Sequence, residues 1–141
     1  MDCNGKVGQK VPLLDWVHAN DWGEINDPFP TGEGQEMVLT LTKGDNIFAL
    51  KVHNDCMEPE FSENDIIIVN PDEKPRNNDF VVAVNRHKNE ATFKQYRVSG
   101  SVHVLRPLNS KYDDIVIENH QGIEIIGVVV EKIRRYGIRK R

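Results

Sequence analysis

A cysteine in the middle of the chain lies where a strand-like segment gives way to a polar turn. Cys56 follows L-K-V at 50–52 and is surrounded by Asp55, Met57 and Pro59. A cysteine thiolate is a strong nucleophile, but a free cysteine is more often a small buried apolar side chain. The residues around Cys56 alone leave both interpretations open.

A lysine within a second strand-like segment is the other candidate for chemistry. Lys94 lies in A-T-F-K-Q-Y at 91–96, where strand alternation places Thr92, Lys94 and Tyr96 on one face. A lysine in a strand is more often a solvated charge on an exposed face. In a dry pocket beside a nucleophile, a lysine can instead act as a general base.

The elements that must position these residues are short and rich in β-branched side chains. Turns of Asn, Asp, Gly and Pro separate them, which predicts a mostly β domain with antiparallel sheets in a sandwich or partly open barrel and little helix. Residues 37–42 and 47–52 are predicted to pair as a hairpin. The predicted strands cover residues 11–17, 37–42, 47–52, 65–69, 80–84, 91–97, 101–105, 115–117 and 124–133.

An Asn-Asp pair recurs where a turn meets an apolar segment, at 54–55, 64–65 and 78–79. Asparagine is the residue other than glycine that best tolerates a positive φ. The pattern therefore predicts left-handed backbone at Asn54, Asn64 and Asn78.

Composition is that of one globular domain. The 141 residues are 38% hydrophobic and 28% charged, and we expect a linker at residues 1–10 and the domain at 11–141. Apolar runs are strand-sized, which predicts a cytoplasmic protein without a membrane segment or signal peptide. Cys3 and Cys56 form no CxxC pair and have no histidine cluster, so we expect no disulfide framework, metal or other cofactor. Because the body is acidic, we do not expect it to bind DNA specifically.

Four segments, in order, resemble the catalytic domain of LexA-like self-cleaving repressors, particularly those of lambdoid phages. The family strings are close to G-D-S-M-x-P, G-D-x-x-x-V, G-D-x-V-x-A and A-T-x-K. The matching segments here are L-K-V-H-N-D-C-M-E-P, E-N-D-I-I-I-V, N-N-D-F-V-V-A and A-T-F-K-Q-Y. The resemblance extends through V-P-L-L-D-W-V-H-A-N-D-W at 11–22, L-R-P-L-N at 105–109 and I-I-G-V-V-V at 125–130.

The resemblance implies a Ser-Lys-type dyad in which a neutral lysine takes the proton of the nucleophile as it attacks a peptide bond of the same protein. It also implies a homodimer, a RecA filament on single-stranded DNA as the promoter of cleavage, and operator binding through an N-terminal domain that this chain lacks. It implies no small-molecule substrate. The matched positions are Cys56 as nucleophile, Lys94 as general base, Ala19 and Asn20 as the cleaved pair, and Asp55, Met57 and Pro59 as supporting motif residues.

Two departures from the family pattern fall on the reacting groups. Cys56 replaces a serine, and Asn20 replaces the glycine that follows the cleaved alanine. A thiol is a competent nucleophile, but its larger sulfur can be misplaced in a site shaped for a hydroxyl. Asn20 adds bulk where the chain must enter the site. We therefore expect self-cleavage to be reduced or absent.

Three further interpretations stay open. The same domain can serve as the dimerisation module of a repressor that no longer cuts, with Ile125–Ile133 as a long apolar strand that a monomer leaves partly open. It can be a UmuD-like polymerase accessory protein, or a β domain with an unrelated binding role in which Cys56 is buried and Lys94 is on the surface. A helix-turn-helix before residue 1 would favour a repressor over the polymerase subunit.

Overall fold

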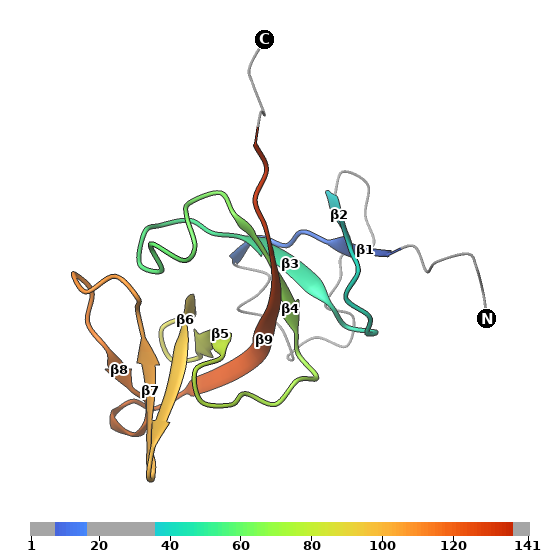
Figure 1. The fold of residues 1–141 in the computed structure, drawn as a ribbon. Coiled ribbons are helices and arrows are strands. Elements are labelled where there is room, and N and C mark those ends of the chain that lie inside the picture. Colours follow the sequence, from blue (N-terminus) through green and yellow to red (C-terminus); the bar gives the residue numbers. More distant parts are fainter. Residues whose placement is uncertain (1–7, 17–35, 137–141) are drawn as a thin grey trace.

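The structure is a computed structural model that describes residues 8–16 and 36–136 (Figure 1). Strands dominate this part of the chain, and one short 3-10 helix, η1 (Ile117–Asn119), interrupts them. The predicted mostly β class is confirmed. No helix within the described ranges is long and apolar enough to cross a membrane.

The strands lie in a small sheet and a large one. The small sheet pairs the first two strands, and the large sheet has the order β3-β4-β9-β5-β6-β7-β8 with every pairing antiparallel. The strands are β1 (Gln9–Pro12), β2 (Met37–Thr40), β3 (Phe48–Lys51), β4 (Ile66–Asn70), β5 (Phe80–Asn85), β6 (Glu90–Ser99), β7 (Val102–Arg106), β8 (Ile115–Val116) and β9 (Ile123–Ile133).

Strand β9 joins the two halves of the large sheet. Its first part pairs with β5 and its last part with β4, with register shifts in both pairings. Figure 1 shows it as a long curved strand running between β4 and β5. Each neighbour therefore covers only one part of β9, residues 123–128 or residues 128–133, and these pairings leave the strand partly unpaired, as expected.

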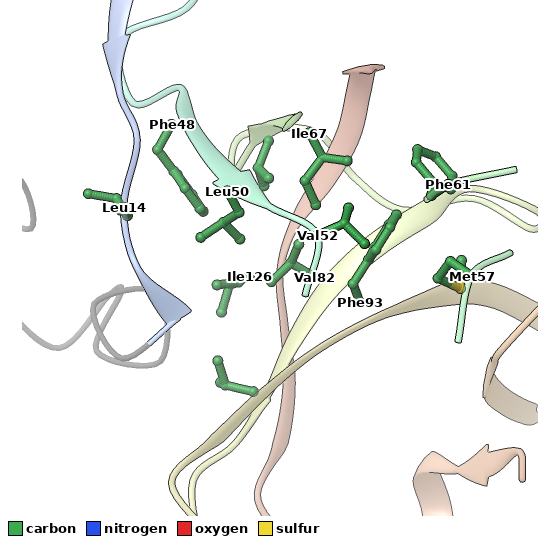
Figure 2. Packing of buried hydrophobic residues seen from close by; sticks show 12 residues of the cluster. Leu14, Phe48, Leu50, Val52, Met57, Phe61, Ile67, Val82, Phe93 and Ile126 are labelled. Atoms are coloured by element: carbon green, nitrogen blue, oxygen red, sulfur yellow. The ribbon is translucent and has the colours of Figure 1, made fainter. Parts of the chain in front are cut away.

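Alternating residues of β3 and β4 face two separate apolar clusters. Phe48, Leu50 and Ile67 pack with Met57 and Phe93 in the larger cluster (Figure 2). The residues between them on these strands, Ala49, Ile66 and Ile68, pack with Val11 and Val38 of the small sheet. Successive residues of a strand point to opposite faces, and both faces of β3 and β4 are covered by apolar clusters. The two strands are therefore almost continuous apolar runs in the sequence.

The hairpin predicted for residues 37–42 and 47–52 is wrong. Both segments contain strands, but β2 pairs with β1 and β3 pairs with β4. The other edge of β3 is bound by the chain that follows β1, where Leu13 bridges Ala49 and the N–H of Leu14 donates to the Ala49 carbonyl at 2.9 Å. Local alternation identified the strands correctly. The edge of β3 that the hairpin would have paired instead binds residues 13–14, which are distant in the sequence.

The predicted left-handed asparagines are partly confirmed. Asn64 and Asn78 have φ of 78° and 79°, and Asn89, which the pattern missed, has φ of 53°. Asn54 does not belong to this group. Its side chain instead accepts the N–H of Cys56, which turns the chain through the carboxamide and not through a left-handed backbone.

Candidate active site

Cys56 lies in the turn that follows β3 and is only 6% exposed. The N–H of Glu58 donates to the Asp55 carbonyl at 3.1 Å, and the N–H of Phe61 donates to the Met57 carbonyl at 2.9 Å. Met57 is 1% exposed and packs in the larger cluster, so it anchors the turn in the core. The Glu58–Pro59 peptide bond is cis, and Pro59 lies on the surface.

Lys94 comes to the thiol from β6, where it pairs with Val81 of β5. It is 9% exposed, and its Nζ lies 3.5 Å from Cys56 Sγ and 2.6 Å from Thr92 Oγ1. The contact with Thr92 confirms that these two residues share a face of the strand. The alternative in which Lys94 is a solvated surface charge is wrong for this structure.

A small pocket opens onto the thiol. Its volume is about 80 Å³, and Cys56 lines it together with Asn54, His53, Thr92 and Trp16. The Trp16 indole N–H donates to the Lys51 carbonyl at 2.9 Å, and its ring meets the His53 ring edge-on at 5.8 Å. Trp16 is thereby fixed beside the site. The proposed cleavage residues, Ala19 and Asn20, lie outside the described residues.

A loop after β7 holds the cysteine turn from the other side. The N–H of Asn109 donates to the Cys56 carbonyl at 3.0 Å, and its carboxamide NH₂ donates to the Asp55 carbonyl at 3.0 Å. Asn109 therefore fixes the peptide units on both sides of the Cys56 Cα, one through its backbone N–H and the other through its side chain. Asn109 was not predicted as a site residue, although it ends the L-R-P-L-N segment that carries part of the resemblance.

The Asp55 carboxylate is bound by the same loop. The Tyr112 hydroxyl donates to one of its oxygens, and Lys111 Nζ lies 2.9 Å from the other. The Tyr112 hydrogen bond, followed by that of Lys111, holds the pKa of Asp55 below its usual value. The same carboxylate raises the pKa of Tyr112 and of Lys111. Asp55 therefore fastens the turn that carries Cys56 to the 109–112 loop.

The arrangement suits proton transfer between a thiol and an amine. The Cys56 thiol and the Lys94 amine are in contact, both are buried, and separate elements hold each of them. Within residues 8–16 and 36–136, no group of His, Cys, Asp and Glu side chains is arranged to hold a metal ion.

Comparison with known proteins gives one family and several relatives. The family described as Peptidase S24-like matches residues 12–130. An HTH-type transcriptional regulator for conjugative element R391 of Providencia rettgeri is 35% identical over 88% of this chain and 60% of its own length. Repressor protein C2 of Salmonella phage P22 is 35% identical over 85% of this chain and 57% of its own.

A LexA repressor of Syntrophobacter fumaroxidans is 37% identical over 89% of this chain and 59% of its own length. The chain thus spans about three fifths of the length of the curated relatives it matches.

Proposed function

Because this chain belongs to the peptidase S24-like family, we propose that it is the C-terminal domain of a phage-type transcriptional repressor and that it cuts its own chain between Ala19 and Asn20. Cys56 is the nucleophile of this reaction and Lys94 is its general base. The observation that carries the proposal is the buried contact of 3.5 Å between Lys94 Nζ and Cys56 Sγ.

In the first half of the proposed reaction, Cys56 Sγ attacks the carbonyl carbon of Ala19 while Lys94 Nζ takes the thiol proton. The carbonyl oxygen carries negative charge until the bond to the Asn20 nitrogen breaks. The ammonium of Lys94 then gives its proton to that nitrogen. This step leaves a thioester between Ala19 and Cys56 and a free amine on Asn20.

In the second half, water attacks the thioester carbon and loses a proton to Lys94. The bond between the carbonyl carbon and Cys56 Sγ then breaks, and the resulting thiolate takes a proton from the Lys94 ammonium. The new carboxylic acid of Ala19 loses its proton to solvent. Lys94 therefore acts alternately as base and acid and ends neutral, as it began.

The position of Trp16 supports cleavage within the same chain. Trp16 lines the pocket at Cys56, and Ala19 follows it by three residues. Three extended residues span at most about 11 Å, so the covalent chain keeps the cleaved bond close to the site.

The relatives support a proposal for the role of the whole protein. Those named above are transcriptional regulators and repressors. We propose that cleavage separates this domain from an N-terminal DNA-binding part, that a RecA filament promotes it, and that it takes place in the cytoplasm, where thiols stay reduced.

Dimerisation is the second proposed role, and the surface of the C-terminal segment favours it. The backbone of β9 pairs with β5 over residues 123–128 and with β4 over residues 128–133, so each part of the strand has one paired edge. Val130 on β9 is 42% exposed and Tyr136 is 82% exposed. We propose that this segment meets a second copy through its exposed side chains. If cleavage is lost, this module remains.

Mass spectrometry of the purified chain, incubated at neutral and at alkaline pH, tests the proposal. Two fragments that separate after Ala19 support it. A chain that remains intact at both values, with its fold verified by circular dichroism, leaves the dimerisation module as the function.

A further inference from the structure

Asn54 binds the nucleophile at two points. Its carboxamide oxygen accepts the N–H of Cys56 at 3.1 Å and lies 2.8 Å from Cys56 Sγ. The N–H of Cys56 can only donate, so it fixes which end of the carboxamide faces the thiol. The oxygen of Asn54 is therefore held beside the sulfur as an acceptor for its proton.

This arrangement directs the thiol proton away from the base. A thiol has one proton and can donate it to one acceptor at a time. With Asn54 Oδ1 at 2.8 Å and Lys94 Nζ at 3.5 Å, the proton faces the carboxamide and Lys94 approaches the sulfur as a donor. Transfer of the proton to Lys94 requires the S–H to rotate away from Asn54.

The same carboxamide occupies a donor that acyl transfer needs. Backbone N–H groups beside a nucleophile stabilise the negative oxygen of the tetrahedral intermediate. The N–H of Cys56 is adjacent to the sulfur in the chain and already donates to Asn54. A substrate carbonyl that uses this N–H must displace the Asn54 oxygen.

We infer that Asn54 masks the nucleophile, holding Cys56 as a protonated thiol with its N–H occupied until the carboxamide swings out. Asn54 is exposed and lines the pocket over the thiol, so its side chain has solvent to move into. The inference concerns the state of the thiol, and it rests on the proposed function only in assigning that thiol to self-cleavage.

The rate of alkylation of Cys56 by iodoacetamide, resolved from Cys3 by peptide mass spectrometry, tests the inference in the full chain. Asn54→Leu keeps the approximate size of the side chain and removes the acceptor, so we expect alkylation to become about five- to tenfold faster, the scale of one or two hydrogen bonds. Asn54→Ala should do the same. Because Asn54 does not have a positive φ, neither variant strains the backbone there.

Asn54→Asp separates masking from simple obstruction of the pocket. A carboxylate keeps the acceptor and adds a negative charge beside the sulfur, which disfavours the thiolate, so alkylation should become slower than in the unmodified chain. Asn70→Ala is the matched control. The Asn70 carboxamide oxygen accepts the N–H of Asp72 at 2.9 Å, as Asn54 accepts the N–H of Cys56. Removing the Asn70 carboxamide should leave the reactivity of Cys56 unchanged.

The outcomes distinguish this inference from the proposed function. Faster alkylation in the Leu and Ala variants, with a slower Asp variant, supports masking whether or not fragments form. Alkylation that becomes faster in Asn54→Ala but not in Asn54→Leu would contradict masking and indicate that the Asn54 side chain only blocks the pocket. Alkylation as fast in Asn54→Asp as in Asn54→Ala would lead to the same conclusion. If alkylation of Cys56 becomes faster but no variant forms fragments, masking is supported and the proposed cleavage is contradicted. If fragments form but alkylation does not change, the proposed cleavage is supported and masking is contradicted.

Discussion

Lys94 Nζ lies 3.5 Å from Cys56 Sγ across 38 residues of sequence, and both side chains are almost completely buried. The lysine comes from the middle of β6 and the cysteine from the turn after β3. The larger apolar cluster, which includes Met57 and Phe93, packs the residues next to both of them. The contact is therefore set by the core and not by a mobile surface.

Replacing the lysine tests its role as a base. Lys94→Met keeps most of the volume of the buried side chain and removes the amine, so cleavage should fall by at least about 100-fold, the usual contribution of a general base. Appearance of the fragment that ends at Ala19, followed by mass spectrometry, measures this. Lys88→Met, in the exposed turn between β5 and β6, is the control and should cleave at the unmodified rate. Equal cleavage in both variants would exclude Lys94 from the chemistry.

The loop that holds the cysteine turn should contribute to the cleavage rate. Asn109→Ala removes the carboxamide hydrogen bond to the Asp55 carbonyl, which loosens the peptide unit next to the nucleophile, and misplaced reacting atoms lower rates steeply. We expect cleavage about tenfold slower. Tyr112→Phe, which loses only the hydroxyl bond to the exposed Asp55 side chain, should have a smaller effect. The reverse ranking would contradict the role given to Asn109.

The ion pair of Asp65 with Arg134 should make stability depend on pH. Asp65 is 3% exposed, and the hydrogen bonds from Arg134 lower its pKa from the ordinary 3.8. A pKa that is lower in the folded state adds stability above about pH 4, and this contribution is lost as pH falls through the folded value. Asp65→Asn should lower the free energy of unfolding by about 1–3 kcal/mol at pH 7, with the difference from the unmodified chain shrinking at acid pH.

Chemical denaturation at pH 7 and at pH 3 measures that difference. Asp114→Asn is the control, because Asp114 pairs with Arg106 in an exposed setting where such pairs contribute at most about 1 kcal/mol. A difference for Asp65→Asn that does not change between the two pH values would contradict the assignment of the pH dependence to this pair.

Self-association should depend on the exposed face of the C-terminal segment. Val130→Asp places a charge on a side chain that is 42% exposed and should shift a dimer towards monomer in sedimentation at tens of micromolar. Val102→Asp is a matched control, since Val102 on β7 is 43% exposed. A monomer before any substitution, or equal loss of association in both variants, would contradict dimerisation through Val130.

The sequence predicted the strands and the proximity of Cys56 to Lys94 better than it predicted the surroundings of these two residues. Alternation in β2 and β3 identified both strands, but alternation carries no information on partners, and Leu13 and Leu14 took the edge of β3. The apolar run of β9 was recognised as a strand, but its division between β5 and β4 could not be predicted, because it depends on segments far away in the chain.

The hydrogen bonds of the side chains around the thiol also could not be predicted from the sequence. Asn54 was expected to turn the chain through its backbone, and it does so through its carboxamide, a choice that local sequence does not determine. Asn109 reaches the cysteine turn across 54 positions of sequence, so spacing could not connect the two.

The most direct test of the Cys56–Lys94 dyad restores the family pattern at both departures. Cys56→Ser supplies the hydroxyl that the family pattern has at this position, and Asn20→Gly removes a side chain next to the bond to be cut. The double variant should therefore cleave faster than the unmodified chain, and faster at alkaline pH because the base must be neutral. Intact-mass measurement after incubation at pH 7 and pH 10 should find fragments 1–19 and 20–141. A double variant that keeps its fold by circular dichroism and stays intact at pH 10 would contradict the peptidase account of this chain.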